Sequence, residues 1–333
     1  MPVFSLFSYK LMFFSASEGD DNLWSSYFKS QFTKKKIRSR KNRKISPGKD
    51  QYYLEECNFF NDHDRVIYFG LVSGTSFLHN RCSFSNCTSK ETGCCIHYNV
   101  DSKSSIVHRR FCCTKCQCSE TGHFSYSSRC SLSFLIESSL FEVGKLNEGQ
   151  SVVHADDNNI IVSSTNFSSC KIPDRPVGFF ATDSNIYRTI INYTTIYNNT
   201  ATDADSSIIK ILNNNLIDSC NFINNRITKS VYAIIHHLHE FIYIKGCSFI
   251  NNRAPPNSYL IFTNIDQFLV DSCYIDNSIS TTFSQKVELK NPRNSFINNL
   301  SHFSTNICYA DFLISINETE TINYFDQKIK RRH

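Results

Sequence analysis

Proline, glycine and long apolar runs are all scarce in this chain of 333 residues. With only 7 Pro and 10 Gly, its turns must be made largely by Asn and Ser. No window reaches the ~18 uninterrupted apolar residues that a membrane-spanning helix needs. Glu137 and Glu142 interrupt the best candidate, residues 134–143. The sequence therefore predicts a soluble chain without a membrane span.

A basic surface is also missing outside one short run. The net charge is +5, but eight of the 35 Lys and Arg residues lie in segment 34–44, and the others are outnumbered by 30 acidic residues. This balance argues against nucleic acid as a partner of the rest of the chain. We interpret 34–44 as a solvated linker; a nuclear-localisation or nucleic-acid element is the alternative.

A hexapeptide that ends in paired asparagines is repeated along the chain. Cys220-Asn-Phe-Ile-Asn-Asn recurs from Cys247, in weaker form from Cys273, and without its cysteine from Ser295. The first two steps are 27 and 26 residues long, and the closest internal match aligns 87–93 with residues that lie 29 positions further on. Self-similarity at a nearly constant period marks a solenoid of stacked units.

The segments between the hexapeptides decide which solenoid this is. Segments such as 160–164 and 207–212 are short, β-branched and closed by Asn, Asp or Ser, as strands are. About three such strands fill one unit, and units stack at ~4.8 Å. The sequence predicts an all-β, right-handed parallel β-helix over residues 51–320. We expect 1–50 to be a disordered or targeting segment and 321–333 a basic tail.

The repeated residues have a structural role in this fold. The Cys and Phe of each hexapeptide are two residues apart, so they face the same side of a strand and stack inside the coil. The following Asn sits at a corner, where it takes left-handed backbone geometry and its amide bonds to the Asn of the next turn. The predicted columns are Cys220, Cys247 and Cys273; Phe222, Phe249 and Phe296; and Asn224, Asn251, Asn277 and Asn298.

Fifteen cysteines are many for a chain of this size. Residues 94–130 hold seven of them, together with His97, His108 and His123. Cys113-Thr-Lys-Cys116 has the spacing of a zinc-binding pair, but Cys94-Cys95 and Cys112-Cys113 are adjacent pairs, a poor geometry for two ligands on one ion. We therefore expect no metal site and no cofactor, and disulfides here stay an open alternative for a secreted protein.

Two features favour a secretory route. Six sequons are present, at Asn86, Asn166, Asn192, Asn198, Asn299 and Asn317, although a chain rich in Asn and Ser also forms such triplets by chance. The apolar segment 4–14, which carries Lys10, precedes a small-residue stretch, Ser15-Ala-Ser17, that would suit signal cleavage. We expect a protein of the cell surface or a secreted one.

The Cys-x-Phe-Ile-Asn-Asn repeats, the Glu-Thr-Gly-x-Phe-Ser-Tyr stretch at 120–126 and the Asn-rich corners resemble a known family. It is the large family of right-handed β-helix surface proteins of trichomonad parasites, whose repeats are similar to those of chlamydial polymorphic outer-membrane proteins. The resemblance covers residues 51 to about 320. It implies a surface or secreted protein with a role in adhesion and no established activity. The chain departs from the family in lacking a clear signal peptide and a C-terminal membrane span.

The rival interpretation is an enzyme, a polysaccharide lyase or glycoside hydrolase of the pectin-degrading β-helix type. Such enzymes group carboxylates on one face, and Asp156-Asp157 with His123 resemble parts of a polygalacturonase site. The Asn-x-Asp and Arg-x-Lys elements of such a site are missing, since 243–245 lacks the arginine. Solvated corner positions explain these three residues more simply.

The sequence thus predicts a non-enzymatic β-helix scaffold that presents an elongated surface for binding or adhesion. A host protein, a glycan and a second copy of the chain all remain open as partners.

Overall fold

The computed structural model describes residues 20–34, 37–38, 50–156, 159–181, 188–212, 214–230, 232–264, 268–276, 281–284 and 287–303. The chain forms two compact units, 1–34 and 35–333. The first contains helix α1 (Asp20–Phe28), where the Trp24 ring packs against Phe28 and Phe32 with centroids 4.2 and 4.7 Å apart. None of the described helices is long and apolar enough to cross a membrane.

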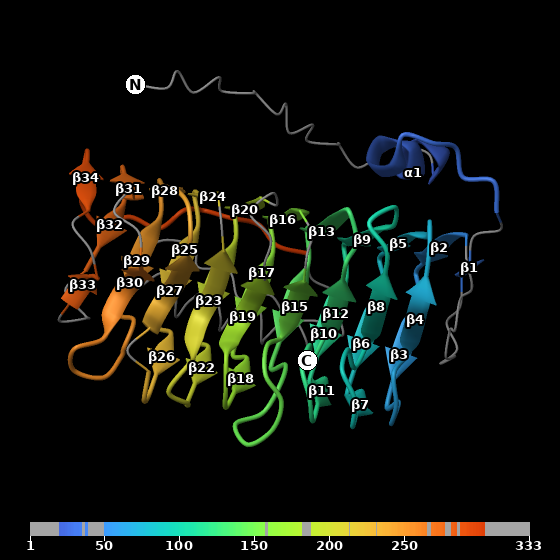
Figure 1. Cartoon of the computed structure of the whole chain (residues 1–333), viewed down its shortest axis with the longest axis horizontal. Coiled ribbons are helices and arrows are strands. Elements are labelled where there is room, and N and C mark those ends of the chain that lie inside the picture. Colours follow the sequence, from blue (N-terminus) through green and yellow to red (C-terminus); the bar gives the residue numbers. More distant parts are fainter. Residues whose placement is uncertain are drawn as a thin grey trace, which may run out of the picture. The chain divides into compact units, whose positions relative to one another are not determined.

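The second unit is a parallel β-solenoid whose turns each add a strand to three long sheets (Figure 1). Sheet A consists of β1 (Ile37–Arg38), β2 (Gln51–Glu55), β5 (Ser76–Asn80), β9 (Ser105–Arg109), β13 (Leu132–Ile136), β16 (Asn159–Ser163), β20 (Thr189–Asn192), β24 (Asn215–Asp218), β28 (Ile242–Lys245), β31 (Phe268–Asp271) and β34 (Glu288–Lys290). Sheet B consists of β4 (Ile67–Val72), β8 (Ile96–Val100), β12 (Ser125–Ser128), β15 (Val153–Asp156), β19 (Pro176–Ala181), β23 (Ser207–Leu212), β27 (Tyr232–Leu238), β30 (Tyr259–Thr263) and β33 (Thr281–Phe283).

Sheet C follows sheet A in each turn. It consists of β3 (Asn58–Phe60), β6 (Ser83–Ser85), β10 (Cys112–Thr114), β14 (Ser139–Phe141), β17 (Asn166–Ser168), β21 (Thr195–Tyr197), β25 (Asn221–Ile223), β29 (Ser248–Ile250) and β32 (Tyr274–Ile275). Two short sheets lie beyond it: β7 (Thr88–Ser89) with β11 (Gln117–Cys118), and β18 (Lys171–Ile172), β22 (Thr200–Ala201) and β26 (Arg226–Ile227). The predicted all-β parallel solenoid is confirmed.

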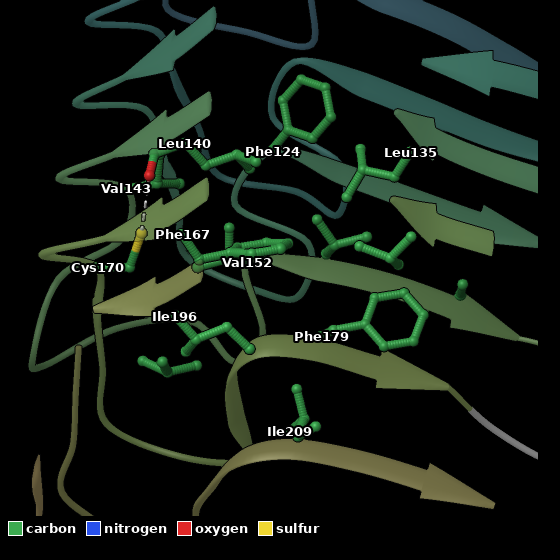
Figure 2. Packing of buried hydrophobic residues seen from close by; sticks show 14 of the residues in the cluster. Phe124, Leu135, Leu140, Val143, Val152, Phe167, Cys170, Phe179, Ile196 and Ile209 are labelled. Carbon is green, nitrogen blue, oxygen red and sulfur yellow. Dashed lines mark hydrogen bonds between the residues drawn. The ribbon is translucent and has the colours of Figure 1, made fainter. Parts of the chain in front are cut away.

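The core lies inside the coil, where alternate side chains of all three sheets meet. Figure 2 shows Leu140 and Phe167 from sheet C together with Leu135 from sheet A and Phe179 from sheet B. Equivalent positions stack from turn to turn, as a period of constant length requires. Phe222 and Phe249, for example, pair in register, and their fully buried rings stack with centroids 4.7 Å apart and planes within 4°.

The cysteine of each hexapeptide follows a corner residue in left-handed backbone conformation. Cys220, Cys247 and Cys273 are buried at equivalent positions, and each thiol donates to the carbonyl oxygen two residues earlier, at 3.3, 3.2 and 3.3 Å. Other turns place Thr165 or Thr194 here, and their hydroxyls donate in the same way at 3.1 and 2.9 Å. Most turns therefore place a small side chain that can donate a hydrogen bond here, whereas one turn places the buried ring of Phe111 at this position.

The asparagine column differs from the expectation by one residue. Asn224 and Asn251 do take left-handed geometry, with φ of 56° and 51°, but their side chains are exposed. The next residue of each pair is buried, because it points into the coil after the corner. A side-chain amide column runs through Asn199, Asn225 and Asn252, with Nδ2–Oδ1 distances of 3.1 and 3.0 Å. Asn277 lies outside the described residues.

Replacing Asn225 with Ala should lower the free energy of unfolding by ~1–3 kcal/mol, because Asn225 accepts from Asn199 and donates to Asn252 where water cannot substitute. The exposed Asn224 provides a matched control. Asn224→Gly, in which glycine suits the positive φ, should change the free energy of unfolding by less than ~0.5 kcal/mol. Urea unfolding of both variants measures the difference. Equal losses at the two positions would mean that the amide column contributes nothing.

The fourth hexapeptide copy, 295–299, is not a turn of the coil. Ile275 of β32, and not Phe296, continues the column below Phe249. The segment instead crosses the outer face of sheet C, where Asn298 exchanges two 2.9 Å hydrogen bonds with Asn221 and His302 lies 2.8 Å from the Thr195 hydroxyl. Phe296 and Asn298 are half-buried there. The expected positions of both residues are therefore corrected.

The coil also begins earlier than residue 51. β1 pairs in parallel with β2, and Arg38 donates to the buried carboxylate of Glu55 at 2.7 Å. Segment 1–50 therefore includes a strand that covers the first edge of sheet A, and trimming the chain to Gln51 would leave the Glu55 carboxylate without this cation.

Candidate functional site

The outer face of sheet A carries a continuous column of apolar side chains. One residue of each strand from β2 to β31 holds the same register position: Tyr53, Leu78, Val107, Phe134, Ile161, Ile190, Leu216, Tyr243 and Leu269. The residues on either side of each point into the core, as Ile160 and Val162 do around Ile161. The first three members are fully buried, and the six from Phe134 onward are partly exposed. We call these six the sheet A row.

Polar and charged side chains border the sheet A row at the carboxyl ends of its strands. The ammonium group of Lys245 lies 3.0 Å from the carboxylate of Asp218, and the hydroxyl of Tyr243 donates to Asp271 at 3.1 Å. Burial, followed by this hydrogen bond, raises the pKa of Tyr243, so the phenol stays neutral. The site is thus an apolar strip with a polar border.

Four rings stack on the outer face of sheet B. Tyr68, His97, Tyr126 and His154 lie on successive turns with centroids 5.1, 5.2 and 5.0 Å apart. Burial, then the charge of Arg65, lowers the pKa of His97 to about 4, so its ring is neutral at pH 7. Rings stacked face to face turn their edges outward, and the stack therefore offers little flat surface to a ligand.

His154 joins a hydrogen-bonded group that has the composition of a catalytic triad. The Ser151 hydroxyl lies 3.3 Å from Nδ1 of His154, and Nε2 lies 2.8 Å from the carboxylate of Asp156. Tyr126 donates to the same carboxylate at 3.2 Å. Ser151, however, is fully buried, so its oxygen cannot reach a substrate. The group holds the corner and the ring stack together.

The residues suggested for the enzyme alternative do not assemble a site. His123 is fully buried, contrary to the expectation of a solvated corner: Nδ1 accepts from the Cys118 amide at 2.9 Å, and the ring packs so closely against Gly149 that a Cβ there would clash with it. Asp156 is occupied by His154 and Tyr126, and Asp157 lies outside the described residues.

Several carboxylates at the described corners pair with cations of neighbouring residues, and Glu137 pairs with both Arg109 and Arg110. Glu56 pairs with Arg81, and Glu142 with Lys115. Pectin-degrading chemistry needs carboxylates gathered on one face, and this arrangement does not favour it.

Four cysteines from two successive turns meet inside the coil. The sulfur atoms of Cys87, Cys95 and Cys116 all lie within 4.8 Å of one another, and the thiols of Cys116 and Cys95 are near enough to that of Cys113 to affect its pKa. All four are fully buried. We call them the thiol cluster. Two adjacent cysteines are poor ligands for one ion, but in the coil one member of each pair, Cys95 and Cys113, is buried on the inside, in successive turns.

The thiol cluster favours one negative charge over several. Burial raises the pKa of Cys95 and Cys113 well above the ordinary value. Burial opposes ionisation of Cys116 too, but hydrogen bonds with the thiols of Cys113, Cys87 and Cys95 outweigh it and hold the pKa of Cys116 well below its usual range. The 29-residue offset between 87–93 and 116–122 was the signal in the sequence, because it stacks Cys87 and Cys116.

The sequons divide by exposure. Asn86, Asn198 and Asn299 are exposed, so a glycan fits at each of them. Asn166 and Asn192 are buried, 0% and 4% exposed, because they lie on strands β17 and β20, and a glycan on either amide is incompatible with this packing. Asn317 lies outside the described residues.

Comparisons with known proteins add little to this description. No protein-family model matches the chain, and no curated protein matches it. Among solved structures, it is similar to HetL, a pentapeptide repeat protein involved in heterocyst differentiation regulation from the cyanobacterium Nostoc sp. strain PCC 7120. The match has 14% sequence identity and a TM-score of 0.23, and it covers 73% of this chain and 89% of HetL. A likeness at this level assigns no function to the chain.

Proposed function

We propose that this chain is a non-enzymatic β-solenoid scaffold that binds a partner protein through the sheet A row. The observation that carries the proposal is the unbroken register of six partly exposed apolar side chains on the outside of sheet A. A sheet with one face in water normally alternates apolar and polar residues. Strands that are apolar on both faces are typical of sheets covered on both sides, and contiguous exposed apolar strips mark interaction sites.

The chemistry of the row favours a protein over a glycan. Ile161, Ile190, Leu216 and Leu269 offer no hydrogen-bonding groups to sugar hydroxyls. Five steps of ~4.8 Å give the row a length of about 24 Å. An amphipathic helix of about 16 residues has this length, and its 5.4 Å pitch places about one apolar side chain over each turn.

The proposal places the protein at the cell surface or outside the cell, with adhesion as the role of the binding face. The exposed sequons Asn86, Asn198 and Asn299 support this location, because their side chains are accessible to a glycan. Treating the protein from its own cells with a deglycosylating enzyme should lower its mass. An unchanged mass would contradict a secretory route and leave the binding face to be tested by itself.

Single charges on the sheet A row test the binding face. Beads coated with the full-length protein should bind intact host cells, and Ile190→Asp or Leu216→Asp should reduce binding by about tenfold or more, since each buries a charge in an apolar contact. Asn198→Asp adds the same charge at an exposed corner and should bind as the wild type does. Wild-type binding by both row variants would overturn the proposed face.

Sedimentation of the same proteins distinguishes a second copy from a foreign partner. We expect a monomer for the wild type and all three variants. A wild-type dimer that the two row variants convert to monomer would replace the partner protein with self-association.

A further inference from the structure

The thiol cluster lies at a point where the packing of the coil does not require sulfur. Cys113 occupies the sheet C column between Phe84 of the preceding turn and Leu140 of the following one. Cys95 precedes β8 at the level of Phe124 in the next turn. Apolar side chains without a thiol fill these positions in the neighbouring turns, Val66 and Phe124 beside Cys95 and Phe84 and Leu140 beside Cys113, so packing alone does not require sulfur at either position.

Other buried cysteines of the coil have a simpler role. Cys220, Cys247 and Cys273 each follow a left-handed corner and donate to a backbone carbonyl. Cys87 and Cys116 occupy a different corner, after sheet C, and donate to Ser85 and Thr114 at 3.5 and 3.4 Å. Their sulfurs also converge with that of Cys95, which the corner contacts do not explain.

The distances suit a tetrahedral ion. Zinc in proteins binds thiolate sulfur at ~2.3 Å, which puts the sulfurs of a tetrahedral site ~3.8 Å apart. Three sulfurs of the cluster, those of Cys87, Cys95 and Cys116, already lie within 4.8 Å of one another, and the buried Cys113 lies three residues before Cys116 in the same turn. Closing these three around an ion therefore needs shifts of about an ångström or less per sulfur, and rotation of the Cys113 side chain would supply the fourth ligand.

We propose that the thiol cluster is a binding site for one Zn²⁺ ion, held by Cys87, Cys95, Cys113 and Cys116. Each ligand binds as a thiolate, and its proton passes to solvent as the ion is taken up. Cys87 and Cys95 belong to one turn, and Cys113 and Cys116 to the next, so the ion links two turns of the solenoid. A four-sulfur, closed site without a water position is structural and not catalytic.

The test uses the full-length protein, refolded under reducing conditions in the presence of Co²⁺, because the buried thiols admit an ion most readily while the chain folds. We expect about one Co²⁺ per chain, with the thiolate-to-metal charge-transfer band and the intense visible bands of tetrahedral cobalt, both abolished by adding Zn²⁺. Refolded wild type without these bands would overturn the proposal, whatever any variant does.

A matched pair of variants locates the ion. Cys116→Ser should lose the cobalt bands, whereas Cys247→Ser removes an equally buried thiol in a distant turn and should keep them. Far-ultraviolet circular dichroism confirms that both variants fold. Equal spectra for the two would place the ion elsewhere and overturn the assignment.

A count of thiols completes the test. Alkylation of the unfolded wild type under non-reducing conditions should modify all four cysteines of the cluster once the metal is removed. A disulfide joining two of them in the native protein would replace the metal site with a covalent link between turns and overturn the proposal.

Discussion

Replacing Phe249 with Ala should lower the free energy of unfolding by ~3–5 kcal/mol, the largest effect we expect from a single substitution. Phe249 is fully buried, its ring stacks on Phe222 at 4.7 Å, and Ile275 continues the column on its other side. The close stacking of adjacent turns leaves little freedom to collapse around the lost ring, so a cavity remains. Urea unfolding of the variant and the wild type measures the loss.

Phe60 provides the control for this substitution. It lies in β3, on the same sheet, but points outward and is 48% exposed. Phe60→Ala should therefore change the free energy of unfolding by no more than about 1 kcal/mol. If the two alanine variants lost the same amount, the stacked column would not be the source of the coil's stability.

The sequence predicted the repeat and its interior well, because both follow from periodicity. A step of 26 or 27 residues places Cys220 above Cys247, and the two-residue spacing to Phe222 and Phe249 puts both types of side chain on the same face of a strand. Neither inference depends on distant contacts. The parallel solenoid followed from the same regularity.

The sequence predictions were wrong where a shift of one residue decides which side chain points into the coil. At a left-handed corner the side chain of Asn224 turns outward, and the buried amide column passes to Asn225. Which asparagine of a pair points inward depends on the corner's backbone geometry, which the sequence does not reveal. Residues 295–299 match the hexapeptide, but they do not form a further turn. They follow β34 and cross the outer face of sheet C, where Asn298 hydrogen-bonds with Asn221.

Both candidate sites are formed by residues of more than one turn, so predicting them requires knowing how the turns stack. The sheet A row needs the register of six strands, while the sequence shows only separate apolar segments such as 160–162. The thiol cluster was indicated by the offset that aligns Cys87 with Cys116. The arrival of Cys95 and Cys113 in the same space depends on the cross-section of the coil, so adjacent cysteines gave a misleading signal.

Two buried histidines give the second large prediction, a loss of stability in mild acid. Nε2 of His79 lies 2.6 Å from Nδ1 of His108, and both rings are packed among Phe84, Phe111 and Phe124. Burial, together with the neighbouring His108, lowers the pKa of His79 well below its ordinary value, and burial lowers the pKa of His108 to about 3. One of the two ring nitrogens donates its N–H to the lone pair of the other. The contact therefore needs no additional proton, and both histidines are neutral in the folded protein.

The direction of the pH effect follows from the two pKa values of His108. The unfolded chain binds a proton below pH ~6.5, whereas the folded chain resists protonation down to about 3. The stabilisation is therefore complete above ~6.5 and is lost as the pH falls through this window, with about 2 kcal/mol gone at pH 5 from His108 alone. Urea unfolding at about pH 7.5 and pH 5 should show this drop in the wild type.

Replacing both histidines with leucine should remove that part of the pH dependence, because the double variant has no imidazole to protonate at this point of the core. Its loss between the two pH values should be smaller than the wild type's by about 2 kcal/mol or more. Other buried histidines, such as His236, whose pKa burial lowers to about 3, still contribute, so the remaining slope is not zero. His63→Leu, at an exposed position, should leave the wild-type drop unchanged. An identical drop in the double variant would mean that the His79–His108 pair is already charged in the folded protein, which this apolar packing does not permit without a paired anion.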